Sequence, residues 1–296
     1  MLNVENIDDR TVSLTFDRYR TCYLLRDRKT VLVDCGYPAD HPSLLAGLSR
    51  LGLDPGDIDC LALTHIHLDH AGGAGHLARL NPKIVVYVHG LGVRHLADPS
   101  RLLQAAAGAY GKRFAAIGSM LPVPEGNLRT IDSDDTIALG DTHLEVHYTP
   151  GHAKHHVIFH DPFSASVFSG DALGSKFADQ PSFIITPPSD YDKCQAIDSI
   201  DRIQALRPKR IHFAHCGTYS LNPRERLFED LKQDHEQWTR CIASILNESP
   251  EMDTSALWEA FLAQQPDLRR YPDHHPSFVL SVRGIRAYIE RKKNRR

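Results

Sequence analysis

The 296-residue sequence lacks the marks of several protein classes. No apolar run reaches the roughly 18 uninterrupted residues that a membrane span needs. The first residues, MLNVEN, contain no basic segment followed by an apolar core, so we expect no secretory signal. The six cysteines form no CxxC pair and no dense framework, which favours reduced thiols over a disulfide scaffold. These absences predict a cytoplasmic protein without a membrane partner.

Charge is distributed unevenly, although the net charge is only -3. Residues 283–296 hold seven basic side chains against one acid, a local balance of +6 that leaves -9 for the rest. Basic termini can bind phosphate groups, but charged chain ends are more commonly solvated, and the remaining chain is acidic. We therefore expect no nucleic-acid partner and treat the terminal run as solvated.

The densest chemical pattern is HIHLDH, which directly follows the apolar run 60–63. It places His65, His67, Asp69 and His70 within six positions. Imidazole nitrogens and carboxylate oxygens suit zinc, iron and similar divalent ions, and this spacing lets one turn direct four donors into a small volume. A surface loop rich in histidine is the alternative, because such tracts can bind metal incidentally.

Three later donors weaken that alternative. His152, Asp171 and His215 each follow an apolar run of strand character. Loops that leave the same edge of a sheet bring distant residues into one site on a rigid scaffold. The sequence therefore predicts one pocket for all of these donors.

The motif HxHxDH, followed by PGH, SGD and AHCG, resembles the metallo-β-lactamase superfamily over residues 10 to 220 or so. The resemblance implies two metals, as in glyoxalase II-like hydrolases. It assigns His65, His67 and His152 to the first metal and Asp69, His70 and His215 to the second, with Asp171 as the bridge. True β-lactamases commonly have a cysteine ligand where this chain has Asp171, so penicillin hydrolysis is not the leading interpretation.

The expected fold class is α/β. Short β-prone runs at 12–16, 22–25, 31–33 and 61–64, with further runs at 84–89, 129–131, 144–148, 157–160, 167–169 and 211–214, predict two β-rich halves. Helices are expected at 43–51, 69–80 and 193–206. Two β-rich halves flanked by helices favour sheet packed on sheet, and the resemblance implies the αββα sandwich of the family. An insertion spans 91–124, and its role is open.

After Asn222 the predicted elements are helices alone, at 224–246, 255–263 and 277–291. We therefore divide the chain into a catalytic domain, 1–222, and a C-terminal helical extension, 223–296. Such extensions cap a cleft or form a dimer contact, so a homodimer is compatible with the sequence.

The resemblance implies hydrolysis. Two metals a few ångströms apart generate hydroxide near neutral pH and polarise a carbonyl group. We expect Asp69 and Asp171 to be catalytic by holding the attacking water, and the substrate to be a small acyl compound, a thioester or an ester. Zinc is favoured as the metal, and iron and manganese also accept these donors.

Other functions stay open. A lactonase typically adds a tyrosine near the bridging aspartate, and residues 173–175 supply none. A phosphodiesterase or ribonuclease would share the dinuclear site, but there is no room for the long insertion of the RNA-cleaving branch. A persulfide dioxygenase would use a single iron, whereas seven donors favour two metals. A non-catalytic metal-binding protein is the least favoured alternative.

Several residues are expected to support the site without binding metal. Asp34, at the end of the run 31–33, resembles the acidic residue that the family places under the metal loop, so the resemblance implies that it supports this loop, and Thr64 should stabilise the turn. Asp192 should cap the helix that begins at Lys193. Neither His155 nor His156 is expected to be a ligand.

Overall fold

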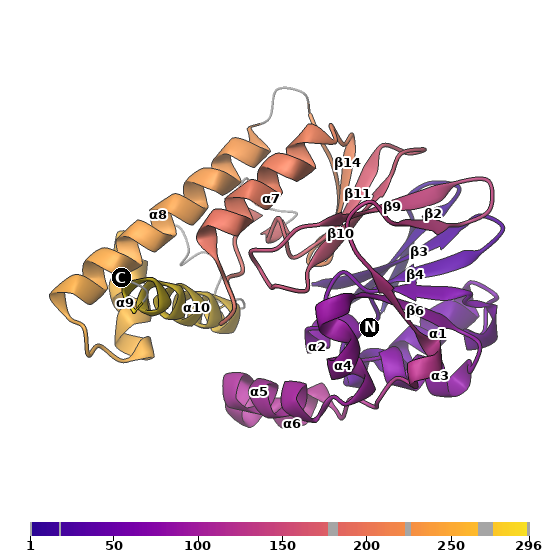
Figure 1. Cartoon of the computed structure of the whole chain (residues 1–296), viewed down its shortest axis with the longest axis horizontal. Coiled ribbons are helices and arrows are strands. Elements are labelled where there is room, and N and C mark those ends of the chain that lie inside the picture. The colour runs from indigo at the N-terminus through magenta and orange to yellow at the C-terminus, as the bar shows by residue number, and fades with distance from the viewer. Residues whose placement is uncertain (1, 18, 177–182, 223–225, 266–274, 295–296) are drawn as a thin grey trace.

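The computed structural model describes residues 2–17, 19–176, 183–222, 226–265 and 275–294. Two β-sheets pack face to face, and helices cover the outer face of each sheet (Figure 1). This is the αββα sandwich that the family resemblance implies. None of the described helices is both long and apolar enough to cross a membrane.

The first sheet has seven strands in the order in which they occur in the chain. Neighbouring strands are antiparallel up to β4 and parallel from β4 to β7. The strands are β1 (Asn3–Asn6), β2 (Thr11–Phe16), β3 (Arg20–Arg26), β4 (Thr30–Val33), β5 (Cys60–Ala62), β6 (Val85–His89) and β7 (Leu128–Ile131). The interior strand β5 is buried along its whole length, as is usual for a parallel strand covered on both faces.

The second sheet has six strands in the order β15-β14-β11-β10-β9-β8. All its neighbours are antiparallel except β11 and β14. The strands are β8 (Thr136–Ala138), β9 (His143–Tyr148), β10 (Val157–Asp161), β11 (Ser166–Gly170), β14 (Arg210–Phe213) and β15 (Gly217–Ser220). A separate short hairpin pairs β12 (Ser175–Lys176) with β13 (Phe183–Ile184).

Three hydrophobic clusters correspond to the layers of the sandwich. The inner cluster joins the two sheets, with Val31 and Val33 on one side and Val146 and Phe159 on the other. A second cluster lies between the first sheet and its helices. The third lies between the second sheet and the helices of the C-terminal half. Burial of these apolar faces stabilises the stacked layers.

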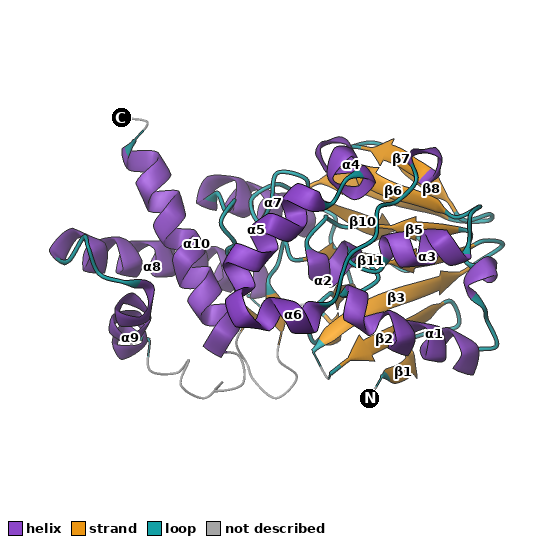
Figure 2. Ribbon diagram, turned by 90° about the horizontal axis from the view of Figure 1, so that it is seen from below, coloured by secondary structure: helices purple, strands orange, loops and turns teal. Residues whose placement is uncertain are grey.

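The helices of the first layer are α1 (His41–Arg50), α2 (Leu68–Ala71), α3 (Ala74–Leu80), α4 (Gly90–Ala97), α5 (Ser100–Tyr110) and α6 (Phe114–Ile117), as Figure 2 shows from below. The prediction of one helix over 69–80 is wrong in part, since this segment forms α2 and α3. The break falls at Gly72-Gly73, and glycine is a poor helix former. The insertion 91–124 is largely helical.

The helices of the other layer are α7 (Lys193–Ala205), α8 (Leu227–Glu248), α9 (Thr254–Gln264) and α10 (His275–Lys293). Asp192 caps α7 as predicted, because its carboxylate accepts hydrogen bonds from the backbone N–H groups of Cys194 and Gln195. Residues from α8 to α10 share the third cluster with the second sheet. The division at 222/223 stays a prediction.

The basic C-terminal run is not simply solvated, so that expectation is wrong for two of its arginines. Arg291 donates hydrogen bonds of 2.6 Å to the backbone oxygens of Ser189 and Tyr191. Arg286 donates to the backbone oxygen of Met252 and pairs with Glu290. Charge patterning along the chain could not predict these contacts, because the acceptors are backbone carbonyls of distant segments.

Candidate metal centre

The predicted donors meet at one edge of the sandwich, where strands from both sheets end. His65 and His67 follow β5, and Asp69 and His70 lie on α2 immediately after them. The other three donors come from the second sheet: His152 follows β9, Asp171 follows β11 and His215 follows β14. All seven are buried or half-buried. The structure therefore brings together every site residue that the sequence predicts.

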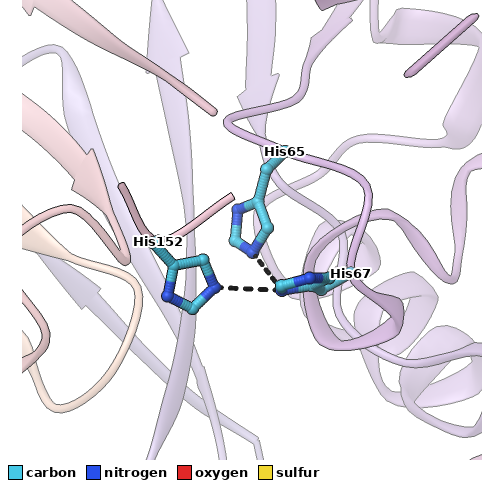
Figure 3. Close-up of side chains that lie close together, drawn as sticks. All are labelled: His65, His67 and His152. Carbon is cyan, nitrogen blue, oxygen red and sulfur yellow. Dashed lines mark hydrogen bonds between the residues drawn. The ribbon is translucent and has the colours of Figure 1, made fainter. Parts of the chain in front are cut away.

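Three imidazoles converge on one point (Figure 3). Nδ1 of His67 lies 3.0 Å from Nε2 of His65 and 3.0 Å from Nε2 of His152. The three rings come from two different sheets, and their nearest contacts are ring nitrogens. Three nitrogens that face one another at this distance form a donor set for a single cation.

A second group contains Asp69, His70 and His215. Oδ2 of Asp69 lies 3.8 Å from Nε2 of His70 and 3.7 Å from Nε2 of His215. The donor atoms of this group also lie within the reach of one cation. Its mixture of imidazole and carboxylate suits zinc, iron and manganese alike, so the donors do not select among these metals.

The carboxylate of Asp171 lies between the two groups. Its Oδ2 is 3.4 Å from Nε2 of His152, in the first group. Its Oδ1 is 3.4 Å from Nε2 of His70 and 3.2 Å from Nε2 of His215, in the second. One oxygen thus faces each group, which is the position that a bridging ligand requires.

Buried polar atoms without partners test whether these residues fit a pair of metals. Nε2 of His70 and Oδ1 of Asp171 are both hidden from solvent, and neither has a hydrogen-bond partner among the described residues. An unsatisfied buried polar atom costs roughly 1–3 kcal/mol. A cation beside both atoms would satisfy them, so the residues fit a dinuclear site.

Asp34 orients the metal loop from beneath. It accepts hydrogen bonds from Nδ1 of His70 at 2.8 Å, from the backbone N–H of Thr64 at 2.9 Å and from Oγ1 of Thr64 at 2.8 Å. Oγ1 of Thr64 lies 3.1 Å from Nδ1 of His65 and is placed to accept its proton. These contacts assign the Nε2 lone pairs of His65 and His70 to the site. Asp34 and Thr64 support the loop, as predicted.

His156 has a positioning role that the sequence did not indicate. Its Nε2 accepts the backbone N–H of Asp171 at 3.1 Å, so Nδ1 carries the proton and donates it to Oγ1 of Thr149 at 2.9 Å. Burial lowers its pKa to about 3, which keeps the ring neutral. His155 lies beside the first group, and burial lowers its pKa to about 2. Neither residue belongs to a donor group, in agreement with the prediction.

The electrostatics of the site favour neutral imidazoles in the first group, beside a charged carboxylate. Burial lowers the pKa of His65, His67 and His152. For His70, the carboxylates of Asp171, Asp69 and Asp34 outweigh burial and raise the pKa. Burial alone would raise the pKa of Asp171, but the surrounding imidazoles hold it well below its usual range. Metal binding takes deprotonated ligands, which the first group and Asp171 supply, whereas a cation would displace the proton that these carboxylates favour on His70.

Tyr19 is the second residue that sequence reasoning missed. It lies in the turn between β2 and β3, and its ring stacks on that of His215, with the centroids 4.7 Å apart. Its hydroxyl lies 3.3 Å from Oγ of Ser175. Burial raises the pKa of the phenol, which keeps it protonated at neutral pH. Backbone contacts with the segment around His215 hold this turn in place: Arg20 pairs with His215, and the backbone N–H of Cys216 donates to the backbone oxygen of Tyr19 at 2.6 Å. A local motif does not reveal such contacts.

The insertion reaches the Asp69 side of the site. Tyr110, at the end of α5, accepts a hydrogen bond of 3.2 Å from the hydroxyl of Tyr37. Burial raises the pKa of both phenols, and the charge of Asp69 adds to this effect. The insertion residues Lys112 and Arg113 are instead exposed.

Two further side chains near the site have structural partners. Tyr191 is buried beside the pocket bordered by His152 and Asp171, and its hydroxyl bonds to Nδ1 of His235. His89 caps α4 by accepting the N–H of Leu91.

Comparison with known proteins agrees with this geometry. The metallo-β-lactamase fold-containing protein ST1585 of Sulfurisphaera tokodaii is 28% identical over 224 residues, 74% of this chain and 79% of the relative. A hydroxyacylglutathione hydrolase of Synechococcus is 26% identical over 219 residues, 72% and 69% of the two chains. The solved structure of TTHA1429, a metallo-β-lactamase family protein from Thermus thermophilus, matches with a TM-score of 0.64 at 20% identity and covers 99% of this chain and 93% of its own.

Residues 15–215, which include all seven donors, match the description of the metallo-β-lactamase superfamily. The family assignment thus covers most strands of both sheets and the complete set of predicted ligands. The chain belongs to the metallo-β-lactamase superfamily.

Proposed function

We propose that this protein is a dinuclear metal-dependent hydrolase that cleaves the acyl bond of a small thioester or ester. The observation that carries the proposal is the position of Asp171, with one carboxylate oxygen facing each donor group. Zinc is the favoured metal, and iron and manganese fit the same donors. A cytoplasmic location and a homodimer remain part of the proposal.

When bound, the metals supply a deprotonated water near neutral pH and a Lewis acid for the acyl carbonyl. Asp69 and Asp171 orient the attacking water. Asp34 and Thr64 keep the Nε2 atoms of the ligating histidines directed into the site. Tyr19, protonated and stacked on His215, is placed to donate a hydrogen bond to the acyl oxygen or to the leaving group.

The relatives support an acyl substrate, because the name of the Synechococcus protein describes hydrolysis of an acylated thiol. Tyr19 also favours a second candidate, a lactonase. The sequence offers no tyrosine immediately after Asp171, but the fold brings one to His215 from the turn after β2. A lactone presents the same acyl carbon, so both candidates use the same site.

Metal quantification of the purified protein, combined with a panel of thioesters, lactones, β-lactams and phosphodiesters, tests the proposal. We expect about two metals per chain at the site around Asp171, and turnover of thioesters or lactones. Preference for a phosphodiester would favour the nuclease alternative. A single iron with oxygen uptake on a persulfide would favour the dioxygenase.

Asp171→Asn separates the role of the bridge from general damage to the fold. It should abolish turnover and reduce metal content together, because the amide offers a single neutral acceptor in place of two charged oxygens. Full activity of a variant with empty metal sites would refute the dinuclear mechanism.

A further inference from the structure

A second cluster of metal-type donors lies on the outer face of the second sheet. Glu145 and His147 are two positions apart on β9, so their side chains share a face. His160 lies directly opposite Glu145 on the neighbouring strand β10. Leu144 and Val146, which alternate with these residues, belong to the cluster between the sheets. The three donors are thus separated from the inner core by the sheet itself.

The geometry of the cluster is close to that of a metal site. Oε2 of Glu145 lies 2.8 Å from Nδ1 of His160 and 3.6 Å from Nε2 of His147. All three donor atoms lie within 4.8 Å of one another. Around a tetrahedral zinc ion, with bonds of about 2.0–2.1 Å, neighbouring donors are roughly 3.4 Å apart. Small side-chain movements would therefore admit an ion.

One nitrogen atom of the cluster is buried without a hydrogen-bond partner among the described residues. Nε2 of His147 is hidden from solvent and has no hydrogen-bond partner among the described residues, although the side chain as a whole is 29% exposed. The hydrogen bond between His160 and Glu145 accounts for those two groups but leaves this nitrogen unsatisfied.

We propose that Glu145, His147 and His160 form a third metal site, which binds one divalent transition ion of the zinc class. Two imidazoles and one carboxylate are a common zinc donor set, and water can complete the shell. His143 is a candidate fourth ligand, since its Nε2 lies 3.8 Å from Oε1 of Glu145. The ion would link strand β9 to strand β10, and it is not needed for the proposed hydrolysis.

The experiment compares Zn²⁺ stoichiometry, after equilibrium dialysis, in the wild-type chain and in the double variant Glu145→Gln/His147→Asn. We expect the wild type to bind one equivalent more than the double variant. A matched control, His95→Asn, removes a histidine that belongs to no donor group and should leave the stoichiometry of the wild type unchanged. The comparison depends only on the difference, so it does not require the catalytic site to hold two metals.

Co²⁺ provides a second measurement. The wild type minus the double variant should show the visible absorption of a tetrahedral cobalt site. If the double variant does not fold, His147→Asn alone replaces it, because Nε2 of His147 has no hydrogen-bond partner among the described residues and lies 3.6 Å from Glu145. Equal Zn²⁺ stoichiometry in the wild type and the folded variant, with no cobalt difference spectrum, would overturn the proposal.

Discussion

Oδ2 of Asp34 lies 2.8 Å from Nδ1 of His70, on the side of the ring away from the metal site. Because Nδ1 donates its proton to this carboxylate, the lone pair of the ring is on Nε2, which faces Asp171. A residue that binds no metal therefore determines which nitrogen of a ligand is available.

Asp34→Asn tests this relationship. The backbone at this position has φ of 58°, a left-handed conformation that asparagine tolerates, so the fold should survive. The neutral amide holds the ring less strongly, and loss of such a contact typically lowers metal affinity or activity about 10- to 100-fold. Chelator competition together with kcat measures the effect. Unchanged affinity would show that His70 is oriented by other contacts.

Gly170→Ala should damage the site through packing. A Cβ there would lie 2.6 Å from Nε2 of His156 and 2.8 Å from Cβ of Thr64, and φ is 48°. We expect the loop that carries Asp171 to move, with loss of metal and of stability beyond the roughly 1–2 kcal/mol that the left-handed backbone alone costs. Thermal unfolding and metal content measure this.

Gly52→Ala is the matched control for that variant. It has φ of 72°, but its Cβ would meet nothing within 4 Å. This variant should lose only the roughly 1–2 kcal/mol of stability that a left-handed backbone costs a residue with a Cβ, and it should keep its metals. Equal losses in the two variants would show that contact with His156 and Thr64 is unimportant.

Tyr19→Phe keeps the ring that stacks on His215 and removes the hydroxyl. If the phenol donates a hydrogen bond in the transition state, kcat should fall about 100- to 1,000-fold, the range for loss of one such donor, while metal content stays constant. Steady-state kinetics on the best substrate of the panel, with metal analysis of the same sample, checks this. A loss of metal would instead indicate a structural role.

Asp234, on α8, makes stability depend on pH. Burial, with the nearby charge of Asp230, raises the pKa of its carboxyl to about 7, from 3.8 in the unfolded chain. Between about pH 4 and 7 the unfolded chain releases this proton while the folded chain retains it. The free energy of unfolding therefore falls as pH rises through this window.

Asp234→Asn should remove that dependence, because the amide does not ionise. Relative to the wild type, we expect the variant to gain roughly 4 kcal/mol at pH 8 compared with pH 4, since one pKa unit corresponds to about 1.4 kcal/mol. Urea unfolding at the two pH values measures the difference. A constant difference between the variant and the wild type would contradict the raised pKa.

The donors were predictable because each follows a strand with a clear apolar pattern. Loops that leave the same edge of a sheet bring such residues together, even when they are far apart in the sequence. Asp34 was predictable for the same reason. His156 and Tyr19 were not, since their roles depend on partners such as the backbone N–H of Asp171 and the ring of His215.

Some elements of the fold also escaped prediction. The strands β1 and β15 are short edge strands with little burial, so their sequences show no strong alternation. The break between α2 and α3 was missed because the apolar pattern continues through Gly72-Gly73. Local patterns predict buried elements well but carry little information about sheet edges and helix breaks.

The division of the donors between the two sheets has a kinetic consequence. His65 and His67 follow a strand of the first sheet, whereas His152, Asp171 and His215 follow strands of the second. Neither half alone can hold the complete pair of ions, so tight uptake must wait until the sheets have docked. In the Glu145→Gln/His147→Asn variant, which lacks the proposed third site, the appearance of a bound-cobalt spectrum during refolding from denaturant would therefore time that late assembly step, separately from the formation of either sheet.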